Sequence, residues 1–122
     1  MDVWFDDGNT IVAVGDKRFC VYAGILSSMS SIFRDMFQVS KSPQQEHVDG
    51  RPVVHLVGDS PEDVSYLLKA MHDISFFLPP PARVSFAVAS GILRTSTKYD
   101  ISILRHRALL HLSKVYATSL SE

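Results

Sequence analysis

The sequence predicts an α+β domain with about five helices and a small three-stranded sheet. Two β-branched segments flank Gly15-Asp16, which indicates a β-hairpin near the amino end. In the second half, apolar residues recur at helical spacing behind residues that favour helix starts. Because 122 residues suffice for one domain with its own core, we interpret these patterns as parts of a single fold.

The first half is expected to begin with the hairpin and to continue into two short helices. Thr10–Val14 and Arg18–Tyr22 are the expected strands, and Gly24-Ile25-Leu26 begins a short helical turn. Ser30 is placed to cap a second helix, because its hydroxyl can accept from a backbone N–H of the first turn. The apolar residues of that helix are Ile32, Phe33, Met36 and Phe37.

The middle of the chain contains a polar segment and a third strand. Gln38 to Pro52 shows no sustained periodicity and is expected to be an exposed loop. Val53 to Val57 is nearly continuously apolar, which predicts a third strand that is either buried on both faces or packed beneath helices, with a structural role for His55. Cys20 is the only cysteine, so no internal disulfide is possible, and its apolar strand favours a buried thiol.

The strongest helix signal begins at Ser60, a capping residue followed by Pro61 and two acidic residues. The expected buried face of this helix is Val64, Leu67, Leu68 and Met71. The helix is expected to end at His72-Asp73. Beyond it, Phe76-Phe77-Leu78 beside three prolines forms either a core plug or an exposed docking patch, and we favour the core plug.

Two further helices are expected, at about Val84 to Tyr99 and Ser102 to Tyr116. Gly91 costs the first of them about 1 kcal/mol of helix propensity, which close packing against a neighbour would explain. The expected inner residues of the first helix are Phe86, Ala89, Leu93 and Ser96 or Thr97. Those of the second are Leu104, Ala108, Leu112 and Val115, with Arg105, Arg107, His111 and Lys114 facing water.

The order hairpin, two helices, strand and three helices resembles the BTB (POZ) domain family. The resemblance is carried by Lys17 to Ser28, by Ser30 to Phe37 (SSIFRDMF) and by Pro61 to His72 (PEDVSYLLKAMH). Gly91 to Asp100 followed by Leu104-Arg105 is similar to the form found in fungal BTB proteins. The resemblance implies a BTB/POZ-like fold, a helical cluster of about five helices capped by the small three-stranded sheet. It also implies a protein-interaction module without catalytic machinery. It also implies a division into an amino-terminal extension (1–8), the BTB/POZ domain (9–116) and a carboxyl-terminal tail (117–122).

The resemblance further implies association with other proteins. Self-association as a homodimer or heterodimer is one possibility, although only Met1 to Gly8 precedes the hairpin, where strand-swapped family members have a helix and a strand. Trp4 and Phe5 either pack across a subunit boundary or cover the core edge of their own chain, and we favour the second interpretation. The alternative function is that of an adaptor for a cullin-based ubiquitin ligase. Adaptors of the family carry a hydrophobic-x-acidic motif after the second helix, and this motif is missing from Gln38 to Pro43. The candidate residues for contact with a cullin are Val39, Tyr66 and His106.

Composition and motif spacing argue against other classes of function. A formal charge of −1 gives no global basis for binding nucleic acid or an acidic membrane, and no apolar run approaches the roughly 20 residues of a membrane span. The five histidines lack metal-binding spacing, the glycines form no phosphate loop, and we expect no cofactor and no catalytic residue. The acidic amino end does not have the form of a secretory signal, so we expect an intracellular protein of the cytoplasm, the nucleus or both.

One alternative from a different class stays open, a small helical domain that binds nucleic acid. It depends on a basic face in the last two predicted helices, formed by Arg94, Lys98, Arg105, His106, Arg107, His111 and Lys114. An ordinary solvated face explains the same residues more simply, because the domain as a whole is not basic. This face could also contact an acidic partner protein.

Overall fold

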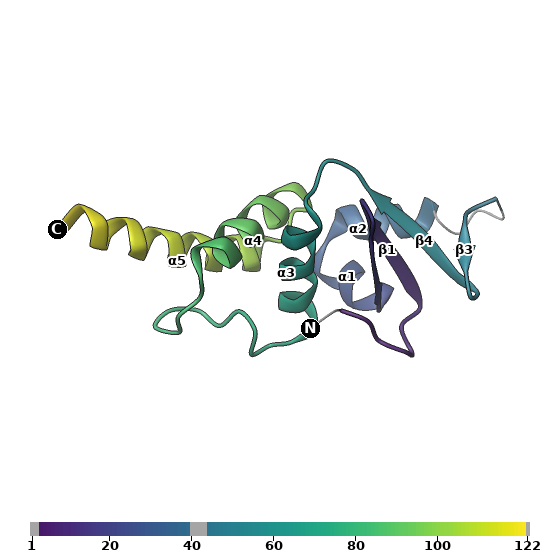
Figure 1. Ribbon diagram of the computed structural model, residues 1–122, viewed down its shortest axis with the longest axis horizontal. Helices are drawn as coiled ribbons and strands as arrows, with labels where there is room; N and C mark the ends of the chain where they lie inside the picture. Colours follow the sequence, from purple (N-terminus) through teal and green to yellow (C-terminus); the bar gives the residue numbers. More distant parts are fainter. Residues whose placement is uncertain (1–2, 40–43, 122) are drawn as a thin grey trace.

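The computed structural model describes residues 3–39 and 44–121, with side chains described as far as residue 113. Nine elements follow one another in this part of the chain: β1 (Thr10–Val14), β2 (Lys17–Val21), α1 (Ala23–Met29), α2 (Ser31–Val39), β3 (His47–Val48), β4 (Arg51–Leu56), α3 (Pro61–His72), α4 (Phe86–Lys98) and α5 (Ser102–Ser121). In Figure 1 the sheet with α1 and α2 lies at one end of the molecule, α3 lies in the middle, and α4 and α5 lie at the other end. The α+β class and the five helices agree with the sequence analysis.

The sheet has four strands in the order β2-β1-β4-β3, so the expectation of three strands was wrong. β1 pairs antiparallel with β2 and parallel with β4, and β3 pairs antiparallel with β4. The additional strand lies inside the segment expected to be a loop. It is only two residues long, which is too short for any periodicity, but Asp49 and Gly50 have φ of 53° and 79° and form the tight turn that joins it to β4.

Both faces of the sheet are buried. Val12, Val54 and Leu56 face the helices as part of the main core, and Ile11 and Val53 belong to a second, small cluster on the opposite face. Cys20 has 0% exposure within this second cluster, so the expectation of a buried thiol is confirmed. His55 is exposed, and its Nε2 lies 2.8 Å from the Glu46 carboxylate on the segment leading into β3.

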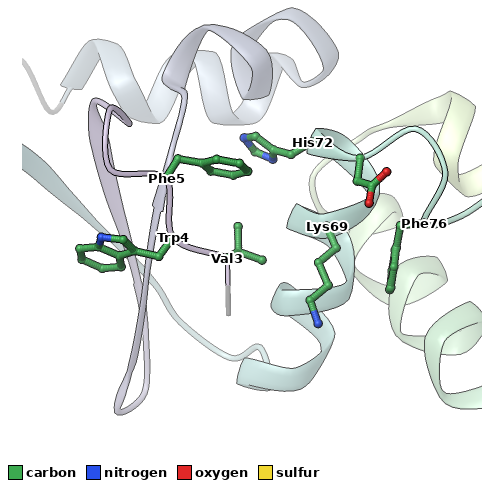
Figure 2. A pocket seen from close by; sticks show the side chains of 7 residues that line it. Val3, Trp4, Phe5, Lys69, His72 and Phe76 are labelled. Carbon is green, nitrogen blue, oxygen red and sulfur yellow. The ribbon is translucent and has the colours of Figure 1, made fainter. Parts of the chain in front are cut away.

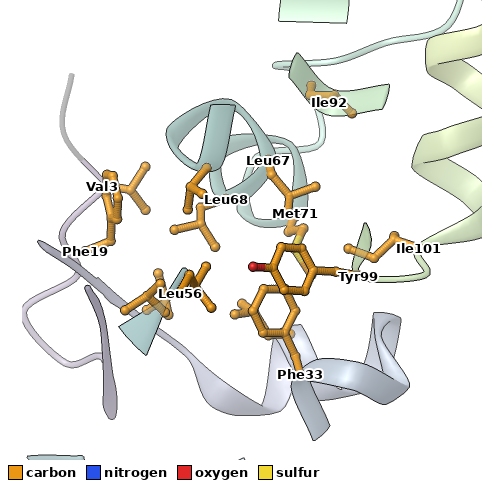
Figure 3. Packing of buried hydrophobic residues seen from close by; sticks show 14 of the residues in the cluster. Val3, Phe19, Phe33, Leu56, Leu67, Leu68, Met71, Ile92, Tyr99 and Ile101 are labelled. Carbon is orange, nitrogen blue, oxygen red and sulfur yellow. The ribbon is translucent and has the colours of Figure 1, made fainter. Parts of the chain in front are cut away.

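The main core forms where α2, α3 and the end of α4 converge on the inner face of the sheet. Figure 3 shows the rings of Phe33 and Tyr99 side by side, and their centroids are 4.6 Å apart. Ser30 caps α2 as expected, accepting from the Phe33 N–H at 3.0 Å. Its hydroxyl also donates to the Tyr99 carbonyl at 2.6 Å, which connects the start of α2 to the end of α4. The expected inner face of α3 is confirmed in full, with Val64, Leu67, Leu68 and Met71 buried.

Helix α4 uses a different face from the expected one. Phe86 is 69% exposed, Leu93 is half-buried and Thr97 is exposed, whereas Ala89 and Ser96 are buried as expected. The full set of buried residues is Ala89, Gly91, Ile92, Thr95 and Ser96. Small residues let α4 approach α3 closely: a Cβ at Gly91 would lie 2.6 Å from Asp63 Oδ1 and 3.1 Å from Tyr66 Cδ2. Close packing therefore explains Gly91, and it rotates the larger Phe86 away from the core.

Helix α5 buries Leu104 and Ala108 as expected, but His111 is also buried, which corrects the expectation that it faces water. Its Nε2 lies 2.7 Å from the Leu78 carbonyl, and half-buried Arg107 donates to the Phe77 carbonyl at 2.9 Å. These two side chains provide partners for carbonyl groups of the irregular segment between α3 and α4, where no helix or strand supplies them. Within that segment Phe77 is 1% exposed, so the core-plug interpretation holds for this residue, whereas Leu78 is 43% exposed.

Candidate protein interface

The segment Val3–Phe5 lies along the outer edge of β2. The Cys20 N–H donates to the Val3 carbonyl at 3.2 Å, and the Phe5 N–H donates to the Cys20 carbonyl at 3.0 Å, which pairs Trp4 in parallel with Cys20. Because side chains of an extended segment alternate between two sides, Val3 and Phe5 share one side and Trp4 takes the other. Figure 2 shows Val3 and Phe5 on the side of α3 and Trp4 pointing away from it.

A largely apolar groove of about 480 Å³ separates this segment from the carboxyl-terminal half of α3. Its lining residues are Val3, Trp4, Phe5, Lys69, His72, Asp73 and Phe76. The Lys69 ammonium lies 5.7 Å from the centre of the Phe76 ring, and Phe76 is partly buried against the core. The groove thus combines an apolar interior with charged groups at the end of α3, the combination found at many protein contacts.

His72 connects the groove to the core. Its ring is stacked on Phe5 with centroids 5.1 Å apart and lies 6.0 Å from the ring of Tyr22. The ring Nδ1 lies 2.8 Å from the Leu68 carbonyl, so Nδ1 carries the proton, and Nε2 is a buried nitrogen without a hydrogen-bond partner in the described part of the chain. Burial lowers the pKa of the imidazole below its ordinary value of 6.5, which keeps the ring neutral near pH 7.

The structure brings together two of the five candidate interface residues, Trp4 and Phe5, which contribute to the same groove. Phe5 is partly buried against the core, in the manner of a residue that covers the core edge of its own chain. Trp4 remains 47% exposed, which leaves a large aromatic surface available to a partner. Sequence reasoning missed Lys69, His72 and Phe76, although their i, i+3 and i+7 spacing places them on one side of the end of α3 and its extension.

The other three candidates lie on three separate helices and line no common pocket with one another. Val39 at the end of α2 is 73% exposed and borders a shallow depression of about 280 Å³ that includes Met36 and Val54. Tyr66 on α3 is half-buried and borders a smaller depression of about 160 Å³ beside Phe19. His106 is exposed on α5.

Part of the basic face expected on the last two helices is used in contacts within the chain. Arg94 makes a paired contact with the Asp63 carboxylate at 2.8 and 3.0 Å, and Lys98 contacts the Asp59 carboxylate at 2.9 Å. Together with Arg107 and His111, four of the seven basic side chains are therefore bound to groups of the chain itself. Arg105 and His106 are exposed, and the Lys114 side chain lies outside the described residues, so the nucleic-acid alternative stays a prediction with fewer free charges to support it.

The described residues contain neither a cluster of metal-binding side chains nor a helix suited to a bilayer. No group of three or more histidine, cysteine, aspartate or glutamate side chains between residues 3 and 39 or 44 and 113 is arranged to hold a metal ion. Among the helices that the structure describes, none combines the length and the hydropathy needed to cross a bilayer.

Comparison with solved structures identifies the fold. The BTB domain of zebrafish PATZ1 superimposes with a TM-score of 0.65 at 11% sequence identity, over 88% of this chain and 76% of that one. The BTB domain of human Gigaxonin superimposes with a TM-score of 0.61 at 11% identity, over 82% of this chain and 73% of that one. No curated protein matches the sequence.

The family itself is identified by sequence. The BTB/POZ domain model matches residues 7–114, which is most of the chain. A BTB/POZ domain is a non-catalytic protein-protein interaction module. The hairpin, the two short helices, the parallel strand, α3 and α4 all lie within the matched range, which ends inside α5. The chain described here therefore belongs to the BTB/POZ domain family.

Proposed function

We propose that this BTB/POZ domain acts as a scaffold that associates with itself or with another protein through the groove between Val3–Phe5 and α3. Two observations support the proposal: Trp4 is 47% exposed on the side of the segment that points away from α3, and Trp4 also lines the apolar groove of about 480 Å³. Burying half an indole at a contact removes a large apolar area from water and would favour association. We place this activity inside the cell, in the cytoplasm or the nucleus. That the chain is of the fungal BTB type, as the segment from Gly91 to Asp100 suggested, stays a prediction.

Self-association is tested by measuring mass with light scattering over a hundredfold range of concentration. We expect the mass to approach that of a dimer at high concentration and to return to that of one chain in the Trp4→Glu variant. Val57→Glu is the matched control, because Val57 is 82% exposed just after β4 and lines none of the three depressions described above. A mass that never exceeds one chain, or that falls equally in both variants, would refute self-association through this groove.

The adaptor function is a second candidate, supported by the exposure of Val39 and His106. A cullin amino-terminal domain titrated into the purified chain by calorimetry should give saturable binding at micromolar or tighter affinity. Val39→Asp or His106→Glu should weaken that binding at least tenfold, and Val57→Asp should leave it unchanged. Absence of binding by folded protein would exclude the adaptor function.

A further inference from the structure

The solvent-facing side of α5 is unusually apolar. At 100° per residue, its exposed residues fall on one continuous arc: Ser102, Ile103, Arg105, His106, Leu109, Leu110 and Ser113. Ile103, Leu109 and Leu110 are 58%, 39% and 44% exposed. Ile103, His106 and Leu110 follow one another at i, i+3 and i+7, which aligns them along the helix. We call Ile103, His106, Leu109 and Leu110 the α5 stripe.

The domain's own core does not require the α5 stripe. Leu104, Ala108 and His111 lie on the opposite side of the helix and are buried, and α5 packs along α4. Figure 1 shows that the end of α5 continues past α4 with no other described element beside it.

The charge of α5 indicates the kind of partner. Residues 102–121 include Arg105, Arg107, Lys114 and two histidines but no aspartate or glutamate. Arg107 is occupied by the Phe77 carbonyl, whereas the exposed Arg105 side chain has no ion-pair partner within the described part of the chain. Two copies of the chain meeting along α5 would bring like charges together, which is unfavourable at a contact. Carboxylates beside an aliphatic surface would complement both features of the stripe.

We propose that the α5 stripe binds an amphipathic helix of a different protein, one that presents aliphatic side chains flanked by aspartate or glutamate. The aliphatic residues would cover Ile103, Leu109 and Leu110, and the carboxylates would pair with Arg105. The inference rests on the proposed role as an interaction module. The stripe lies away from the groove at Trp4 but shares His106 with the surface proposed for a cullin, so the peptide test changes Ile103, Leu110 and Arg105 and not His106. Loss of one contact therefore leaves the other measurable.

The test uses two synthetic helical peptides of 21 residues with the same leucine stripe, one flanked by glutamate and the other by lysine. Fluorescence anisotropy with the full chain should show micromolar binding of the glutamate peptide and at least tenfold weaker binding of the lysine peptide. The Ile103→Ser/Leu110→Ser double variant should weaken binding of the glutamate peptide at least tenfold. Arg105→Glu should reverse the preference, because it replaces the attractive charge with a repulsive one.

Several outcomes would overturn the proposal. They are no binding of the glutamate peptide, equal binding of both peptides, or an unchanged preference in Arg105→Glu. Val57→Ser is the control for a nonspecific apolar effect, and an equal loss in that variant would also count against the stripe. The chain alone could also form a dimer that dissociates in the Ile103→Ser/Leu110→Ser variant but persists in the Trp4→Glu variant. That result would show that a second copy covers α5, and it would exclude the acidic partner. Circular dichroism checks that each variant is folded.

Discussion

The Tyr99 hydroxyl connects the corner between α4 and α5 to the segment that follows β4. Tyr99 is 1% exposed, and its hydroxyl donates to Asp59 Oδ2 at 2.5 Å. The same carboxylate oxygen accepts from Lys98 Nζ at 2.9 Å, and the Asp59 side chain is 7% exposed. Burial first, and then the bond to Asp59, raise the pKa of the Tyr99 phenol, so it remains a neutral donor throughout the physiological range.

Tyr99→Phe removes this hydroxyl and keeps the ring that stacks on Phe33. A hydrogen bond to a charged acceptor contributes about 1.5–3 kcal/mol, and we expect the lower half of that range because Lys98 still contacts the carboxylate. With an unfolding entropy of about 2.1 cal/mol/K per residue, a loss of about 2 kcal/mol lowers Tm by about 8 °C. The backbone and the ring packing should not change.

Urea denaturation followed by circular dichroism at pH 7 measures the change in the free energy of unfolding. Tyr66→Phe is the control, because Tyr66 is half-buried and its hydroxyl makes no hydrogen bond within the described part of the chain. We expect that variant to stay within about 0.5 kcal/mol of the parent. A Tyr99→Phe variant that also stays within that margin would show that the bond to Asp59 does not stabilise the corner.

Three further predictions concern α1, α3 and α4. Ser60→Ala should lower the free energy of unfolding by about 1 kcal/mol, because the Ser60 hydroxyl accepts from the Asp63 N–H at 3.0 Å. Urea denaturation that finds no loss would show that this hydrogen bond does not stabilise the start of α3. Because burial lowers the pKa of His72, the unfolded chain binds the proton more readily than the folded chain. The free energy of unfolding should therefore fall from pH 7 to pH 5, by less than about 1.4 kcal/mol per pH unit. His72→Phe should flatten that fall, and an unchanged slope would assign it to other groups. Gly24→Ala should gain about 0.5–1 kcal/mol in helix propensity, since nothing lies within 4 Å of the new Cβ. Gly91→Ala should be less stable than Gly24→Ala in thermal melts, because its Cβ would lie 2.6 Å from Asp63 Oδ1. Equal gains in the two variants would refute the close packing at Gly91.

Much of the fold was predictable because its signals are local. Gly15 has a φ of 57° in the hairpin turn, and Ser30 and Ser60 accept hydrogen bonds at the starts of α2 and α3 as expected. The apolar spacing of α3 identified its whole buried face, since that helix is amphipathic with one clear apolar side. The strand β3 was missed because two residues have no periodicity, although Asp49-Gly50 is a turn signal that could have indicated it.

The candidate interface was less predictable than the fold. Trp4 and Phe5 were identified as large aromatics near the chain end, but their opposite orientations follow from pairing with Cys20 in the third dimension. His72 entered the groove only because the Val3–Phe5 segment folds back over α3. Pairing between segments about 70 residues apart leaves no local pattern in either of them.

The sequence alone determined the class of the domain, the starts of its main helices and its membership in an interaction family, because capping, turn chemistry and periodicity act within a few residues. Only the tertiary structure decided which face of α4 is buried and how the basic residues of the last two helices are used. The first outcome depends on Gly91, which has no side chain and so lets Asp63 lie close to its backbone. The second depends on the Phe77 and Leu78 carbonyls, which accept hydrogen bonds from Arg107 and His111. Long-range packing and hydrogen bonding therefore leave α5 with an exposed apolar stripe beside the exposed Arg105, a surface that helical periodicity alone did not indicate.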